Sequence, residues 1–171
     1  MNTEKIKLTQ VSTNEKNPRR ITDGNLKKLI NSILVFPRML ELRPIVIDDA
    51  MIPLGGNMRI KALNIISQMS GEEIEKEVNS IAYDKKTEGE KQTLVEYWKN
   101  WTVNPVVSIV KAEELTPEDK KSFIVKDNVN YGQWDEDLLQ GFDKNLLGEL
   151  GVMEWEQDAA TEITEEKQQL I

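Results

Sequence analysis

The pair Gly55-Gly56 lies between an apolar run that predicts a strand, 51–54, and a helical pattern, 57–69. Glycine permits a positive φ and lets a ligand approach the backbone closely. The first turn of a helix offers unpaired N–H groups and a partial positive charge. Arg59, in that turn, adds a guanidinium suited to a phosphate. The stretch therefore predicts an oxyanion site made of Gly55, Gly56, Asn57, Met58 and Arg59.

Each of these residues also has a structural interpretation, which the sequence leaves open. The glycines alone could make a left-handed turn, and Arg59 could pair with Asp48 or Asp49. Asn57 could offer its side-chain amide to a phosphate or cap the helix. Arg19, which ends a polar connector, either faces the same pocket or is a solvated loop residue.

Basic charge is concentrated near the N-terminus of this 171-residue chain, whose formal net charge is −8. Residues 1–70 hold eleven Lys and Arg against six Asp and Glu, whereas residues 71–171 hold eleven against twenty-four. All five arginines lie in the first segment, and arginine suits phosphate recognition. This asymmetry indicates a surface that faces a polyanion. A phosphate-led, weakly sequence-specific contact with DNA would use, besides Arg19, the residues Arg20, Arg38, Arg43, Lys27 and Lys28.

Cysteine and histidine are both absent from the sequence. Their absence excludes disulfides, thiolate metal sites, a cysteine nucleophile and a Ser-His triad. No apolar run approaches the length of a membrane span, and the N-terminus lacks the apolar region of a signal peptide. We therefore expect a cytoplasmic protein without a membrane partner.

The hydrophobic periodicity predicts an α/β (α+β) fold, a small mixed sheet surrounded by helices. A strand over 105–110 is apolar enough to be central, and Pro53 indicates an edge. Thr116 caps a helix whose end, Asp127-Asn128, is either a turn or a polar recognition element. The other expected elements are strands over 5–11 and 43–48, and helices over 23–36, 72–79 and 91–101. The expected domains are a core over 1–115, a helical extension over 116–155 and an acidic, flexible tail over 156–171.

Five short motifs follow one another along the chain: Asn17-Pro18-Arg19, Leu29-x-x-Ser32-Ile33, Arg43-Pro44-Ile45-Val46, Gly55-Gly56-x-x-Arg59-x-x-Ala62 and Pro105-Val106-Val107. Their order resembles the N-terminal domain of the ParB/sulfiredoxin superfamily, also called the ParB-like nuclease domain. The stretch 115–143 is similar to the segment that follows this domain in phage and mobile-element members. The resemblance covers about residues 5–153.

The resemblance implies a ParB/sulfiredoxin-like core that binds a nucleotide, CTP or ATP with Mg, or a nucleic-acid phosphate at the glycine turn. It implies a role in DNA partitioning, regulation or modification, and it is compatible with a homodimer. In sulfiredoxins a reactive cysteine stands at the position of Asn57, so that activity is excluded here.

Two other functions stay open. One is a nuclease or nucleotide-dependent kinase that uses Mg and carboxylates, for which Glu41, Asp48 and Asp49 are the acids nearest the turn in sequence. The other is a non-catalytic protein-interaction domain.

Overall fold

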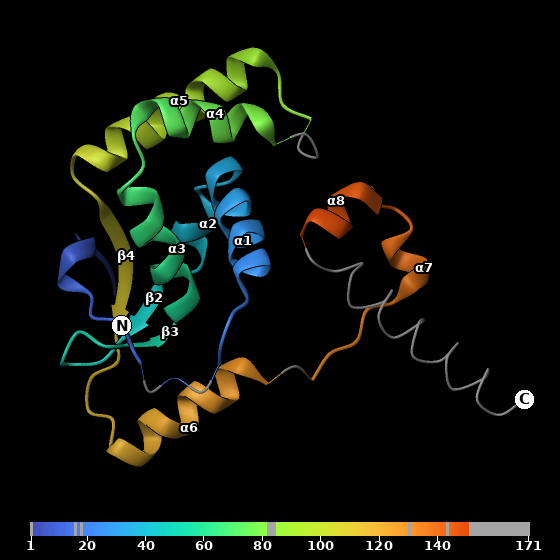
Figure 1. Ribbon diagram of the computed structural model, residues 1–171. Helices are drawn as coiled ribbons and strands as arrows, with labels where there is room; N and C mark the ends of the chain where they lie inside the picture. Colours follow the sequence, from blue (N-terminus) through green and yellow to red (C-terminus); the bar gives the residue numbers. More distant parts are fainter. Residues whose placement is uncertain are drawn as a thin grey trace, which may run out of the picture. The chain divides into compact units, whose positions relative to one another are not determined.

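The computed structural model describes residues 2–15, 17, 19–81, 85–129, 131–142 and 144–150. The chain divides into two compact units, Met1–Tyr131 and Gly132–Ile171. The first unit contains the sheet and the helices α1 to α6 (Figure 1). The described part of the second contains the short helices α7 (Glu136–Leu139) and α8 (Lys144–Glu149).

The division between the units differs from the expected boundary at 115/116. The helix α6 (Pro117–Asn128) packs against strand β3 (Pro53–Gly55), so it belongs to the first unit rather than to an extension. The tail expected over 156–171 lies outside the described residues.

The sheet is mixed, as the sequence predicts, and the fold is α+β. Its four strands lie in the order β1-β4-β2-β3. The central pair, β2 and β4, is parallel, and both outer pairs are antiparallel. Strand β4 is internal and Pro53 begins an edge strand, so both expectations are confirmed. The remaining strands are β1 (Thr3–Lys7), β2 (Ile45–Ile47) and β4 (Val106–Lys111).

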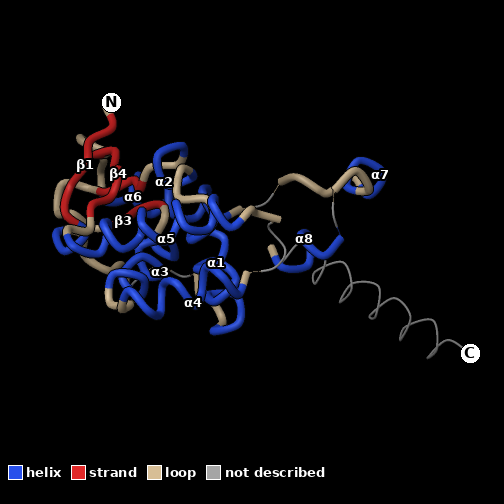
Figure 2. Tube along the Cα trace, turned by 90° about the horizontal axis from the view of Figure 1, so that it is seen from above, coloured by secondary structure: helices blue, strands red, loops and turns tan. Residues whose placement is uncertain are grey.

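Helices gather around this sheet (Figures 1 and 2). Helices α1 and α3 pack on each other and both pack on α5, while α4 pairs with α5. Helix α6 lies beside the edge strand β3. No described helix is both long and apolar enough to cross a membrane. The bounds of the first five helices are α1 (Asp23–Val35), α2 (Met39–Leu42), α3 (Asn57–Ser67), α4 (Gly71–Ser80) and α5 (Glu88–Val103).

Local sequence signals explain where most of these helices begin. Side-chain oxygens of Ser and Thr accept a backbone N–H at the start of four helices, as N-cap residues commonly do. Proline follows the cap of α6, where its missing N–H costs no helical bond. The capping residues are Thr22, Ser70, Thr87 and Thr116.

The expected strand over 5–11 is wrong in its second half. Strand β1 ends at Lys7, and a 3-10 turn, Leu8–Gln10, follows it. Leu8 and Val11 are both buried, and they are three residues apart. Side chains at this spacing eclipse one another in a 3-10 turn, whereas they would point to opposite faces of a strand. Burial of both residues therefore favours the turn.

The core between the helices is centred on Trp98 of α5. Its side chain is 0 % exposed, and its indole Nε1 donates a hydrogen bond to the carbonyl of Leu34 in α1 at 2.8 Å. The indole ring also meets Trp101 edge to face, with ring centroids 5.2 Å apart. This one side chain thus ties α5 to α1 by packing and by a hydrogen bond.

We expect Trp98→Ala to lower the free energy of unfolding by about 3–5 kcal/mol, because it removes a large buried side chain and leaves a cavity. Urea denaturation followed by far-UV circular dichroism measures the change. Trp134→Ala is the control, since that side chain is 55 % exposed, and it should change stability by less than about 0.5 kcal/mol. Equal effects of the two substitutions would contradict a core centred on Trp98.

Candidate functional site

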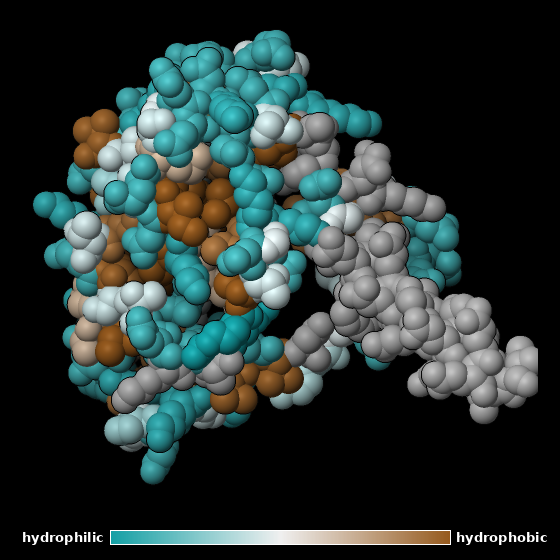
Figure 3. All heavy atoms as spheres, in the orientation of Figure 1, coloured by the Kyte–Doolittle hydropathy of each residue, from teal (hydrophilic) through white to brown (hydrophobic). Residues whose placement is uncertain are grey.

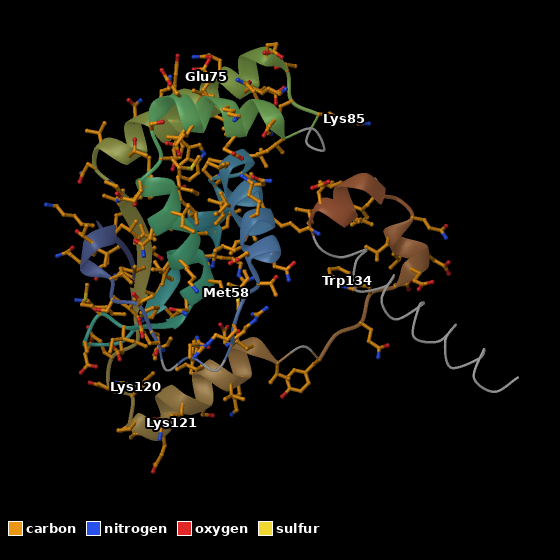
Figure 4. The ribbon with its side chains drawn as sticks, in the orientation of Figure 1. Met58, Glu75, Lys85, Lys120, Lys121 and Trp134 are labelled. Carbon is orange, nitrogen blue, oxygen red and sulfur yellow. The ribbon has the colours of Figure 1, made fainter. Side chains whose placement is uncertain are left out.

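A cavity of about 300 Å³ opens at the first turn of α3. It lies within the first unit and brings together residues from α1, α2, α3, α6 and the N-terminal loop. Met58 lies at this turn (Figure 4). All five residues of the predicted oxyanion stretch, 55–59, line the cavity, and so do Arg19 and Arg43. The other lining residues are Asn17, Leu29, Ser32, Ile33, Met39, Leu40, Leu54, Asp127 and Asn128.

Gly56 is the N-cap of α3, and it adopts a left-handed conformation with φ of 92°. No side chain caps the helix, and the first helical hydrogen bond is donated by Ile60 to the carbonyl of Gly56. The N–H groups of residues 57–59 therefore have no acceptor within the helix. A helix opened by glycine in this way leaves its positive end accessible to an anion.

The guanidinium of Arg59 lies over this glycine. Its Nη2 is 2.9 Å from the position that a Cβ on Gly56 would occupy, and its Nη1 donates to the carbonyl of Arg43. Burial, and then the positive charge of Arg43, lower the pKa of Arg59, whereas Asp127 raises it. Arginine keeps its charge in proteins, so the cavity contains a permanently charged, partly desolvated cation.

The second guanidinium at the cavity belongs to Arg19. Its Nη1 donates to Oδ1 of Asn128 at 2.8 Å, and the amide of Asn128 donates to the carbonyl of Ile124 at 2.6 Å. The last turn of α6 thus holds Arg19 at the cavity. Arg19 therefore lines the pocket, and it is also an exposed residue of the loop.

Asp127 and Asn128 are cavity residues that the sequence does not securely identify. Both belong to the last turn of α6, where Asp127 Oδ2 lies 3.0 Å from the position that a Cβ on Gly55 would occupy. The pair of polar residues at a helix end was the available signal. A simple turn is the commoner use of such a pair. The packing of α6 against β3 is what brings these two residues to the cavity.

The charges that line the cavity are positive in balance. Among the described residues, three arginines and one aspartate line it, in a chain whose formal net charge is −8. Apolar side chains also line the cavity, among them Leu29, Ile33, Met39 and Leu40. Figure 3 shows hydrophobic patches among hydrophilic residues over α1 to α3. The cavity therefore combines an anion-attracting end with an apolar wall.

Two structural interpretations of the predicted residues are wrong. Asn57 does not cap α3, because Gly56 holds that position and Oδ1 of Asn57 accepts instead from the backbone N–H of Asn14 at 3.1 Å. Arg59 does not pair with Asp48 or Asp49, because its guanidinium bonds to a backbone carbonyl at the cavity.

The other predicted basic residues do not join this cavity, except Arg43. Lys27 forms an ion pair with Glu77 of α4, and Arg20 donates to backbone carbonyls, including that of Glu15 at 3.3 Å. Arg38 and Lys28 do not line the cavity either. Lys27 and Arg20 are therefore engaged in contacts with other parts of the protein.

A second cavity of about 220 Å³ shares Arg19, Asn57 and Met58 with the first. Arg20 and Lys61 add positive charge there, and Glu15 is the one acid among the described residues that line it. The shared residues make the two cavities neighbours at the start of α3. A ligand with more than one phosphate could extend from one to the other.

The carboxylates nearest the glycine turn in sequence have partners elsewhere. Asp48 closes the β2–β3 turn by accepting from the N–H groups of Ala50 and Ile52. The Nζ atom of Lys120 in α6 lies 3.6 Å from Oδ2 of Asp48 and 3.0 Å from Oδ1 of Asp49. Among the described residues, no three acids, histidines or cysteines are grouped so that they could hold a metal ion. Asp127 is the carboxylate that reaches the cavity.

We expect Gly56→Ala to destabilise the protein by about 1–3 kcal/mol, because alanine is strained at positive φ. Its Cβ would also overlap Ile45 Cδ1 and press on the Arg59 guanidinium. Gly24→Ala in α1 is the matched control, since no atom lies within 4 Å of the added Cβ. It should leave stability unchanged or raise it by up to about 1 kcal/mol in urea denaturation. Similar losses for both would contradict the strained turn.

We expect the Asp49 carboxylate to titrate below its ordinary pKa of 3.8, chiefly because Lys120 donates a hydrogen bond to it. A lowered pKa means that this contact stabilises the fold above about pH 4 and is lost as pH falls through the folded-state pKa. Carboxyl-detected NMR measures the midpoint. Lys120→Gln should raise the pKa toward 3.8, whereas Lys121→Gln, at the next position of α6, should leave it in place.

Comparisons of this chain with protein-family models, with curated proteins and with solved structures found no match. The function is therefore inferred from the geometry and charge of the cavity.

Proposed function

We propose that the first unit binds the phosphate of a nucleotide at the first turn of α3. Gly55, Gly56, Asn57 and Met58 supply the backbone cradle, and Arg59 and Arg19 supply guanidinium groups. The supporting observation is the meeting of three arginines and an open helix N-terminus at one cavity of an acidic protein. Such convergence of positive groups is costly unless an anion is bound there.

The environment of Arg59 supports an anion as the ligand. Burial and the charge of Arg43 both destabilise its charged form, and the hydrogen bond to the Arg43 carbonyl uses only one of its nitrogens. A phosphate would counter the remaining charge in a place where water screens it poorly. Because the guanidinium is already desolvated and held, little further ordering is needed on binding.

The apolar wall favours a nucleotide over inorganic phosphate. A base can pack on the apolar side chains that line the same cavity, Leu29, Ile33, Met39 and Leu40. A volume of about 300 Å³ is within the range of small-molecule sites. CTP and ATP, with Mg bound to their phosphates, are the nucleotides that we propose to test first.

The biological role that we propose follows the motif order. If the chain is ParB-like and derives from a phage or mobile element, nucleotide binding would serve DNA partitioning, regulation or modification. The motif order supports this role, and the cavity, which residues of four of those motifs line, agrees with it.

A nucleic-acid phosphate is a second candidate ligand, favoured by the neighbouring cavity. Arg20 and Lys61 extend the positive charge beyond Arg19, so successive phosphates of a strand could be accommodated. Binding of this kind would weaken steeply with added salt.

We expect Arg59→Ala to weaken nucleotide binding by about tenfold or more, because it removes a charge-assisted contact to phosphate. Calorimetry with CTP, ATP and short duplex DNA, each at low salt, measures the affinity and separates the two candidates. Arg59→Lys should recover only part of the loss, since lysine keeps the charge but not the planar pair of donors. Arg38→Ala is the control, because that arginine does not line the cavity.

If none of the three ligands binds the unsubstituted protein, the proposed function is wrong and a protein-interaction role takes its place. A thermal-denaturation scan of each variant is needed beside calorimetry, because Arg59 also bonds to the Arg43 carbonyl. Equal losses for Arg59→Ala and Arg38→Ala would place binding outside the cavity.

A further inference from the structure

Asp127 contributes a negative charge to a cavity whose other charged lining residues, among those described, are arginines. Its Oδ2 lies 3.0 Å from the position of a Cβ on Gly55, and Phe123 of the same helix packs 3.3 Å from that position. Among the described residues, none forms a hydrogen bond or ion pair with its carboxylate, although Arg59 is close enough to interact with its charge. The carboxylate thus stands at the cavity with its oxygens available.

An ionised carboxylate can only accept hydrogen bonds. It repels a phosphate, so the part of a ligand that reaches Asp127 must carry donors. The two sugar hydroxyls of a ribonucleotide are such donors, and acidic residues read them in this way in dinucleotide-binding proteins. A deoxyribose lacks one of these groups, and the backbone of DNA offers none.

The spacing of the charged groups selects the sugar rather than the base. The carboxylate of Asp127 lies over Gly55 and the guanidinium of Arg59 lies over Gly56, which is the next residue. The negative charge of Asp127 also raises the pKa of Arg59, so the two charged groups are near enough to interact. The sugar is the part of a nucleotide bonded to the phosphate, whereas the base lies beyond it and would meet the apolar wall.

We propose that Asp127 accepts hydrogen bonds from the sugar hydroxyls of the ligand, which makes the site selective for ribonucleotides over deoxyribonucleotides. This inference rests on the proposed function. Asn128 supports it, because its bonds to Arg19 and to the Ile124 carbonyl hold the last turn of α6 against the cavity. One helix turn thus places a phosphate-facing arginine and a sugar-facing acid.

The test compares the affinities of CTP and ATP with those of their 2′-deoxy and 3′-deoxy forms, by calorimetry on the full chain. We expect the unsubstituted protein to prefer the ribonucleotides by about tenfold or more, because a hydrogen bond to a charged group is lost in the deoxy forms. Asp127→Ala should remove this preference by weakening ribonucleotide binding while leaving deoxyribonucleotide binding unchanged or stronger. The 2′-deoxy and 3′-deoxy arms identify which hydroxyl is bound.

Glu118→Gln is the matched control, because it removes one negative charge from the same helix at its far end. It should keep the preference for ribonucleotides. Equal affinity of the unsubstituted protein for ribo and deoxy forms would overturn the inference and leave nucleotide binding intact. The inference would also be overturned if Asp127→Ala bound ribonucleotides and deoxyribonucleotides more tightly by the same factor. Asp127 would then act only by repelling the phosphates.

Two further results separate this inference from the proposed function. Binding of duplex DNA without binding of any nucleotide would overturn the sugar-reading role of Asp127 but would keep a phosphate site at α3. Binding of none of these ligands would overturn both.

Discussion

The close approach of the Arg59 guanidinium to the backbone of Gly56 is the constraint on which the site depends. Only a residue without a Cβ leaves room for it there, and Gly56 also adopts the left-handed conformation at the start of α3, where no side chain caps the helix. The hydrogen bond to the Arg43 carbonyl then holds the guanidinium over the turn. The contacts of Arg59 thus fix the start of α3 relative to Arg43, which lies in the loop before β2.

The electrostatics of the cavity follow from this packing. Desolvation and the nearby charge of Arg43 act against the charge of Arg59, and Asp127 offsets part of their effect. Asp127 thus offsets part of the unfavourable charge around Arg59. In the role that we propose for it, the same carboxylate also restricts which ligands can bind. A ligand that is only an anion meets repulsion from Asp127, whereas one that carries both an anion and donors can match both ends.

Much of the fold follows from local signals. Thr22, Thr87 and Thr116 cap the helices that they precede, and Pro53 begins the edge strand. The predicted strand over 5–11 is too long, because alternation in a short segment does not separate a strand from a strand followed by a 3-10 turn. Helix α2 was not predicted, since four residues carry too little periodicity to be recognised.

The sequence by itself determined the cradle: a glycine pair before a helix, with an arginine in its first turn, is a local pattern whose geometry follows from backbone sterics. Only the tertiary structure decided which distant groups complete it. Packing of α6 on β3 brings Asp127 and Asn128 to the cavity, while packing of α1 on α4 commits Lys27 to Glu77. Contacts between residues far apart in sequence depend on how helices pack against the sheet, and no local periodicity encodes that arrangement.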